Sequence, residues 1–153
     1  METISSGFYV AVTNNSNKPL IKYEGIEVAP GQVTNIGISK SFHYKLPSPY
    51  GKCSDYSDSE FYNYTVSMGG YTQDQCYEVC FQYLYAIPNC LCADASVGSN
   101  VNNVTFCRFD TNQACLNQQR SSFTSSSCDS ECPMPCERVE YSYKVSISKY
   151  PTE

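Results

Sequence analysis

Hydrophobic and polar residues alternate with a period of two in three stretches of the chain, the pattern of half-buried β-strands. The first stretch is short and has three apolar residues on one side: Phe8, Val10 and Val12. The second follows a turn at residues 29–31 and has one apolar parity: Ile36, Ile38, Phe42, Tyr44 and Leu46. The third has another: Tyr141, Tyr143, Val145 and Ile147. We expect Pro47 and Pro151 to end the second and third strands.

A helical period replaces the alternation in the middle of the chain. Residues 72–75 fit a capping box, in which Thr72 and Gln75 satisfy each other's backbone donors. Apolar residues then recur at steps of three and four: Cys76, Val79, Cys80, Tyr83, Leu84 and Ile87. Pro88 is expected to end this helix. Residues 115–123 predict a weaker second helix, because the serine-rich stretch that follows is poor in helix formers.

The composition indicates an oxidising environment. The chain has 10 cysteines and a single histidine, His43. It contains no Cys-x-x-Cys step, so the cysteines predict disulfides in place of a metal site. Glycosylation sequons begin at Asn14, Asn63 and Asn103 and favour the same extracellular setting. The formal net charge of −5 disfavours non-specific binding to nucleic acid, which requires clustered lysine and arginine.

Two cysteine pairs have a matching spacing of four residues. Cys76 and Cys80 share one face of the predicted helix, and Cys128 and Cys132 repeat their spacing. Antiparallel segments would join Cys76 to Cys132 and Cys80 to Cys128, whereas parallel segments would give the crossed pairing. The chain reversal between residues 90 and 115 favours the antiparallel arrangement.

Features of enzymes and of membrane spans are missing from the sequence. It has no nucleophile elbow, glycine-rich phosphate loop or metal-binding pair, and acid–base chemistry would rest on His43 alone. We therefore predict a protein that is not an enzyme and that has no cofactor. The first six residues differ from a signal peptide, and no apolar run is long enough to cross a bilayer. We expect the chain to be part of a longer protein.

Several motifs occur in an order that resembles a known family. They are Leu46-Pro-Ser-Pro-Tyr-Gly-Lys-Cys53, the Cys76-x3-Cys80-x9-Cys90-x-Cys92 spacing, and the Cys132-Pro-Met-Pro-Cys136-Glu137 run. The chain resembles the ectodomain of the epithelial sodium channel, degenerin and acid-sensing ion channel family. The resemblance covers essentially the whole chain and implies an α+β fold, in which a small, mainly antiparallel palm sheet adjoins a disulfide-laddered helical thumb arm.

The resemblance also implies a division of the chain and a disulfide pairing. Residues 1–49 would form palm and β-ball strands, residues 50–137 the cysteine-rich thumb, and residues 138–153 a returning palm strand. Together with the matched spacings, it implies five nested disulfides: Cys53–Cys136, Cys76–Cys132, Cys80–Cys128, Cys90–Cys115 and Cys92–Cys107.

The functional expectations follow from the same resemblance. The chain would be the extracellular part of an amiloride-sensitive, sodium-selective channel subunit, which transmits a stimulus to a pore formed by transmembrane helices that this chain lacks. Its partners would be those helices and the other subunits of a trimer, on the extracellular side of the plasma membrane. Tyr50 would make the gating contact near the first transmembrane helix.

The sequence also bears on the kind of stimulus and on a second possible class of protein. Residues 111–127 contain no aspartate or glutamate, in contrast to the thumb carboxylates of acid-sensing relatives. Proton sensing by that route is therefore disfavoured. The composition alone is equally consistent with a secreted disulfide-rich binding module or inhibitor.

Overall fold

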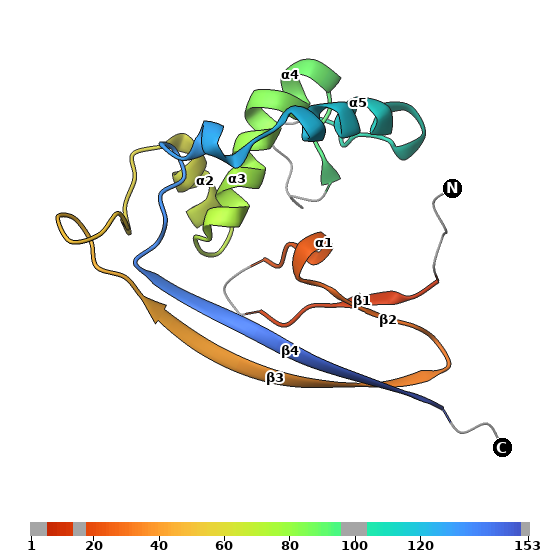
Figure 1. Ribbon diagram of the computed structural model, residues 1–153. Helices are drawn as coiled ribbons and strands as arrows, with labels where there is room; N and C mark the ends of the chain where they lie inside the picture. The colour runs from red at the N-terminus through yellow and green to blue at the C-terminus, as the bar shows by residue number, and fades with distance from the viewer. Residues whose placement is uncertain (1–5, 14–17, 96–103, 151–153) are drawn as a thin grey trace.

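The computed structural model describes residues 6–13, 18–95 and 104–150, and it has a mixed α+β fold (Figure 1). The elements in chain order are β1 (Phe8–Val10), α1 (Ile21–Glu24), β2 (Ile26–Val28), β3 (Gln32–Tyr44), α2 (Glu60–Ser67), α3 (Gln73–Phe81), the π-helix η1 (Gln82–Ala86), α4 (Ile87–Cys90), α5 (Phe109–Ser122), the 3₁₀-helix η3 (Ser125–Cys128) and β4 (Glu137–Lys149). The larger helices gather into one arm, which lies above a long two-stranded ribbon in this view, and the chain connects arm and ribbon at one end of the ribbon.

Strands β3 and β4 form that ribbon. They pair antiparallel along 13 residues each, from Gln32 opposite Lys149 to Tyr44 opposite Glu137. Directly opposed residues share a face, so the register places the apolar residues of both strands together. Ile36 lies opposite Val145 and Phe42 opposite Val139. The two strands predicted from alternation are therefore confirmed, although the first begins four residues before Ile36 and ends at Tyr44, so Leu46 lies outside it and Pro47 is not its stop.

The expectation that these strands are half-buried is wrong for most of their length. Ile38, Phe42 and Val145 are exposed, and only the centre of the apolar face is covered. There the Tyr143 hydroxyl donates to the carbonyl oxygen of Val12 at 3.1 Å. A two-stranded ribbon has two faces and little material to cover them, and this bond brings the N-terminal segment against one face.

A second small sheet consists of β1 and β2. Phe8 pairs with Val28 and Val10 with Ile26, and α1 lies between the two strands in the sequence. The predicted strand at residues 8–12 is present but ends at Val10, where its pairing with Ile26 of β2 ends. In Figure 1 this sheet and α1 lie between the ribbon and the helical arm.

Helix α3 begins at the predicted residue, but its N-terminal cap differs from the predicted capping box. The Thr72 hydroxyl accepts from the backbone N–H of Gln75 at 3.2 Å, as a cap should. No bond from the Thr72 N–H to the Gln75 side chain is seen among the described residues, and the Gln75 amide nitrogen donates to the carbonyl oxygen of Lys18. It thus ties the N-terminal segment to the arm.

The predicted stop at Pro88 is also wrong. The helical path widens into the π-helix η1, continues through α4, and ends where Leu91 adopts a left-handed conformation with φ of 56°. Proline has no N–H and its ring collides with the carbonyl four residues back in a regular helix. The wider π turn before Pro88 provides the room that a regular α-helix lacks.

The remaining helices differ from the sequence prediction in extent. Helix α5 starts six residues before Cys115 and ends at Ser122. The hydroxyls of Ser121 and Ser122 both donate to the carbonyl oxygen of Gln118, which lets serine continue the last turn. Cys128 and Cys132 are not in a continuous helix: one turn, closed by Cys132 N–H donating to the Cys128 carbonyl at 2.9 Å, provides their spacing.

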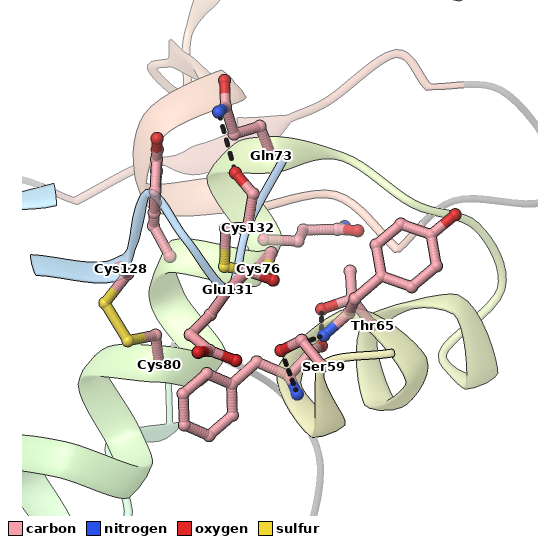
Figure 2. The surroundings of a disulfide bond; sticks show 12 residues. Ser59, Thr65, Gln73, Cys76, Cys80, Cys128, Glu131 and Cys132 are labelled. Carbon is pink, nitrogen blue, oxygen red and sulfur yellow. Dashed lines mark hydrogen bonds between the residues drawn. A yellow bond between two sulfur atoms is a disulfide. The ribbon is translucent and has the colours of Figure 1, made fainter. Parts of the chain in front are cut away.

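Helix α2 was not predicted from the sequence. Its N-cap is Ser59, whose hydroxyl accepts from the backbone N–H of Phe61 at 3.2 Å (Figure 2). Tyr62 and Thr65 are its buried residues, and the helix contacts the neighbouring α3. The core of the arm is rich in half-cystines; one of its two clusters consists of Cys76, Cys80, Cys128 and Cys132.

Candidate functional site

Five disulfides connect the arm into a ladder. They join Cys53 to Cys136, Cys76 to Cys132, Cys80 to Cys128, Cys90 to Cys115 and Cys92 to Cys107. These are the nested pairs of the antiparallel arrangement, so the crossed alternative does not occur. Figure 2 shows the two central rungs between α3 and the segment that follows α5. The four sulfurs of these rungs belong to fully buried residues.

Tyrosine and glutamine side chains reinforce the ladder from one side. The Gln73 amide donates to the carbonyl oxygen of Cys132 at 3.0 Å (Figure 2). The Tyr71 hydroxyl donates to the carbonyl oxygen of Pro133, and the Tyr77 hydroxyl donates to Asp129 at 2.8 Å. Burial, followed by the bond to Asp129, raises the pKa of Tyr77 to about 12. Burial also raises the pKa of Tyr71, so both phenols resist ionisation at alkaline pH more than an exposed tyrosine does.

An ion cluster joins the upper part of the arm. The Arg120 guanidinium on α5 donates to both carboxylate oxygens of Glu78 on α3, and it also donates to Asp94 at 3.1 Å. Its planar group lies 3.7 Å from the centre of the Phe81 ring. The buried Gln82 side chain exchanges two hydrogen bonds with the backbone of Asp94. The cluster therefore fixes α3, α5 and the segment after Cys92 to one another.

The arm meets the ribbon at a junction of two chain segments, one leaving β3 and one entering β4. The Lys45 N–H donates to the carbonyl oxygen of Cys136 at 2.8 Å, and the Ser54 N–H donates to that of Met134 at 2.9 Å. The Cys53–Cys136 disulfide crosses between the same segments. The Asp55 carboxylate accepts from the Cys136 N–H at 2.8 Å. The two segments are thereby fixed together at the base of the arm.

The loop between Pro47 and Cys53 projects from this junction. The Pro47 carbonyl accepts from the N–H groups of Tyr50 and Gly51, at 3.1 and 3.0 Å, and the Ser48–Pro49 bond is cis. A Cβ atom at Gly51 would collide with the carbonyl oxygen of Leu46, so this close approach requires glycine. The Tyr50 side chain is 84% exposed at the tip of the loop.

Of the three glycosylation sequons, only the one at Asn63 lies wholly within the described residues. Asn63 is exposed on α2, while the Thr65 hydroxyl of the same sequon is buried and donates to the carbonyl oxygen of Phe61 at 2.7 Å. Asn14 and Asn103 lie outside the described residues. Glycosylation at all three stays a prediction.

Two kinds of feature are absent from the described ranges. None of the helices there combines the length and apolar character that a bilayer crossing demands. In the same ranges, no group of three or more histidine, cysteine, aspartate or glutamate residues is positioned to hold a metal ion.

The structure defines the class of protein as a disulfide-laddered α+β module in which a helical arm is fixed to a β-ribbon. The chain matches the family model described as amiloride-sensitive sodium channel over residues 1–153. It therefore belongs to that family, as the sequence motifs indicated.

Curated relatives carry corresponding names. The chain is 24% identical to the epithelial sodium channel subunit alpha of Neoceratodus forsteri, with 96% of this chain and 23% of that protein aligned. It is 26% identical to the subunit gamma of Bos taurus, over 97% of this chain and 23% of that protein. It is also 23% identical to a degenerin-like protein of Caenorhabditis elegans, over 96% of this chain and 28% of that protein. The chain thus spans about a quarter of the length of these relatives.

Proposed function

We propose that the chain is the extracellular part of a subunit of a trimeric, sodium-selective, amiloride-sensitive channel. On this proposal it lies on the outer side of the plasma membrane, contacts other subunits, and transmits a stimulus to a pore formed elsewhere in the full-length subunit. Residues 1–49 act as palm and β-ball strands, residues 50–137 as the cysteine-rich thumb, and residues 138–153 as the returning palm strand. The names of the relatives support this proposal and favour a role outside catalysis.

The main observation that supports the proposal is the junction at the base of the arm, where two chain segments are covalently joined. Both segments that connect arm and ribbon are joined there by the Cys53–Cys136 disulfide and by backbone hydrogen bonds of Lys45 and Ser54. Backbone hydrogen bonds contribute about 0.5–1.5 kcal/mol each to stability, whereas the disulfide is a covalent bond that breaks only by a chemical reaction. A displacement of the arm is therefore passed to the ribbon and its loop together.

Tyr50 is the residue that we propose makes the gating contact. Its backbone N–H is held by the Pro47 carbonyl, and its side chain extends into solvent from an anchored loop. An exposed aromatic side chain on a fixed backbone offers a large contact area at a small cost in side-chain entropy. Such a residue suits contact with a neighbouring transmembrane helix.

The test is Tyr50→Ala in the full-length subunit, assembled with its partner subunits. We expect a changed open probability with unchanged surface expression, measured by single-channel recording and surface biotinylation. Tyr56→Ala is the matched control, because Tyr56 is also exposed near the junction and its hydroxyl bonds only the local Asp58 among the partners seen. Normal gating of a surface-expressed Tyr50→Ala channel would assign Tyr50 to packing.

The alternative, a secreted disulfide-rich binding module or inhibitor, predicts a different result. The relatives are named as channel subunits and degenerins, which favours the channel proposal over this one. A secreted module would function without any pore-forming partner. That alternative therefore predicts that Tyr50→Ala has no effect on channel gating. A gating change in the variant would therefore separate the two proposals.

A further inference from the structure

The sequon at Asn63 lies on a helix, although acceptor sites for N-linked glycans are typical of surface loops. Asn63 is exposed on α2, whereas Thr65, the hydroxyl residue of the same sequon, is fully buried. The Thr65 hydroxyl donates to the carbonyl oxygen of Phe61 at 2.7 Å. In the folded arm, the two side chains that define the sequon therefore lie in different environments, one in solvent and one inside the protein.

Contacts with later parts of the chain hold Thr65 in its buried position. Helix α2 has eight residues and contacts α3, and a helix of that length is marginal in water by itself. The ring of Phe61 lies 5.5 Å from that of Tyr83, and the ring of Tyr62 lies 4.4 Å from that of Tyr71, measured between centroids. Phe61 and Tyr71 also pack against the half-cystine cluster of the two central rungs. The burial of Thr65 thus depends on residues that are synthesised after it.

We propose that Asn63 accepts its glycan only before the arm folds, and that the folded arm is not a substrate for the transferase. An oligosaccharyltransferase binds the hydroxyl of the third sequon residue while the asparagine amide reacts. The Asn63 amide nitrogen attacks the first sugar carbon of a lipid-pyrophosphate-linked oligosaccharide; the N–C bond forms and the C–O bond to the pyrophosphate breaks. The nitrogen gives its proton to a base of the transferase, and the lipid pyrophosphate leaves. Thr65 is available for this step only while α2 is open.

The order of synthesis provides an interval in which α2 is open. The rung between Cys76 and Cys132 joins residues 56 positions apart, so it cannot close until the chain extends well beyond α2. Closure of the ladder ends the interval, and a glycan already attached is accommodated because Asn63 is exposed. Glycan occupancy at Asn63 is therefore set by competition between transfer and folding. This inference requires only the oxidising secretory setting that the disulfides indicate, and it does not rest on the proposed channel function.

The first experiment compares the folded and the unfolded chain as acceptors. The chain is produced in bacteria that lack N-glycosylation, and its five disulfides are verified by peptide mapping under non-reducing conditions. It is then incubated with purified oligosaccharyltransferase and lipid-linked oligosaccharide, before and after reduction and alkylation, and transfer to Asn63 is measured by mass spectrometry. We expect transfer to the oxidised chain to be slower by about tenfold or more, because α2 must first open locally. Equal transfer to the two forms would overturn the proposal.

Ser146→Asn provides a matched control on the same molecule. It places a sequon on residues 146–148 of β4, where Ser146 and Ser148 are both exposed. We expect the oxidised chain to be modified at this site as readily as the reduced chain. Loss of transfer at both sites on oxidation would show that folding in general blocks the enzyme, and it would contradict the role assigned to Thr65.

The second experiment follows the timing in cells. The full-length subunit is pulse-labelled, and the glycan at Asn63 is recognised by the gel mobility shift that is lost in Asn63→Gln. Asn63 is exposed, so this variant leaves the buried contacts of α2 in place. We expect the glycan to be present at the end of the pulse and its occupancy to stay constant during the chase. Occupancy that rises after the disulfides have closed, or an Asn63 that is never modified, would show the proposal to be wrong.

Discussion

Replacement of Arg120 by methionine tests the ion cluster at the top of the arm. The Arg120 side chain is 19% exposed, and those of Glu78 and Asp94 are 9% and 16% exposed. Methionine retains the aliphatic packing against Phe81 but removes the charge that both carboxylates share. The substitution removes the Arg120 cation from two carboxylates that lie in a largely buried site.

The expected loss of stability follows from that burial. Removal of one partner from a buried ion pair costs about 3–5 kcal/mol, because the remaining charge stays desolvated. The loss of the guanidinium's contact with the Phe81 ring adds to this cost. With a urea dependence of about 1–3 kcal/mol per molar, the unfolding midpoint should fall by at least about 1 M. The measurement is urea unfolding followed by circular dichroism with all disulfides intact.

A neighbouring arginine provides the control. Arg108, just before α5, pairs with Asp110, but these side chains are 76% and 63% exposed. Exposed pairs contribute about 0.2–1 kcal/mol, so Arg108→Met should barely move the midpoint. Adding Glu78→Gln to Arg120→Met should recover part of the lost stability, because the buried Glu78 carboxylate that Arg120 paired with is then neutral. Equal small effects of Arg120→Met and Arg108→Met would refute the reasoning.

Two further predictions concern the loop and the ladder. Gly51→Ala should cost about 1–3 kcal/mol in thermal unfolding, because its Cβ would collide with the Leu46 carbonyl. Gly37→Ala, whose Cβ would lie 3.7 Å from the Lys144 carbonyl, should be near neutral. At alkaline pH the raised pKa values of Tyr71 and Tyr77 make the folded state hold protons that the unfolded chain releases. Stability should therefore be constant below about pH 10 and fall as pH rises toward 12, with phenolate absorbance following unfolding; loss of stability below pH 9 would contradict this.

The sequence predicted those strands and helix starts that can be recognised from a few neighbouring residues. Alternation indicated β3 and β4, and the Thr72 cap marked the start of α3. Helix α2 has the same kind of start, a serine at the N-cap, yet its apolar residues are few and its buried Thr65 is polar. A search for serine caps followed by aromatic residues would have found it.

Long-range features could not be predicted in this way. Arg120 and Glu78 are 42 residues apart, and nothing in either neighbourhood signals the partner. The stop expected at Pro88 was wrong because the helical path passes through a π turn just before the proline, and the local sequence carried no signal for that turn. The disulfide pairs are the exception, since matched spacing and the family motifs together restricted the choices.

The apolar face of the ribbon shows what alternation does and does not specify. Period two places residues such as Phe42 and Val139 on one face, and the register confirms that they are opposed. The pattern carries no information about what covers that face. In the part of the chain that the structure describes, Val12 accepts a bond from Tyr143, while Ile38 and Phe42 remain exposed. Alternation therefore predicted the strands and the side of each residue correctly, whereas burial depends on tertiary contacts that no local pattern encodes.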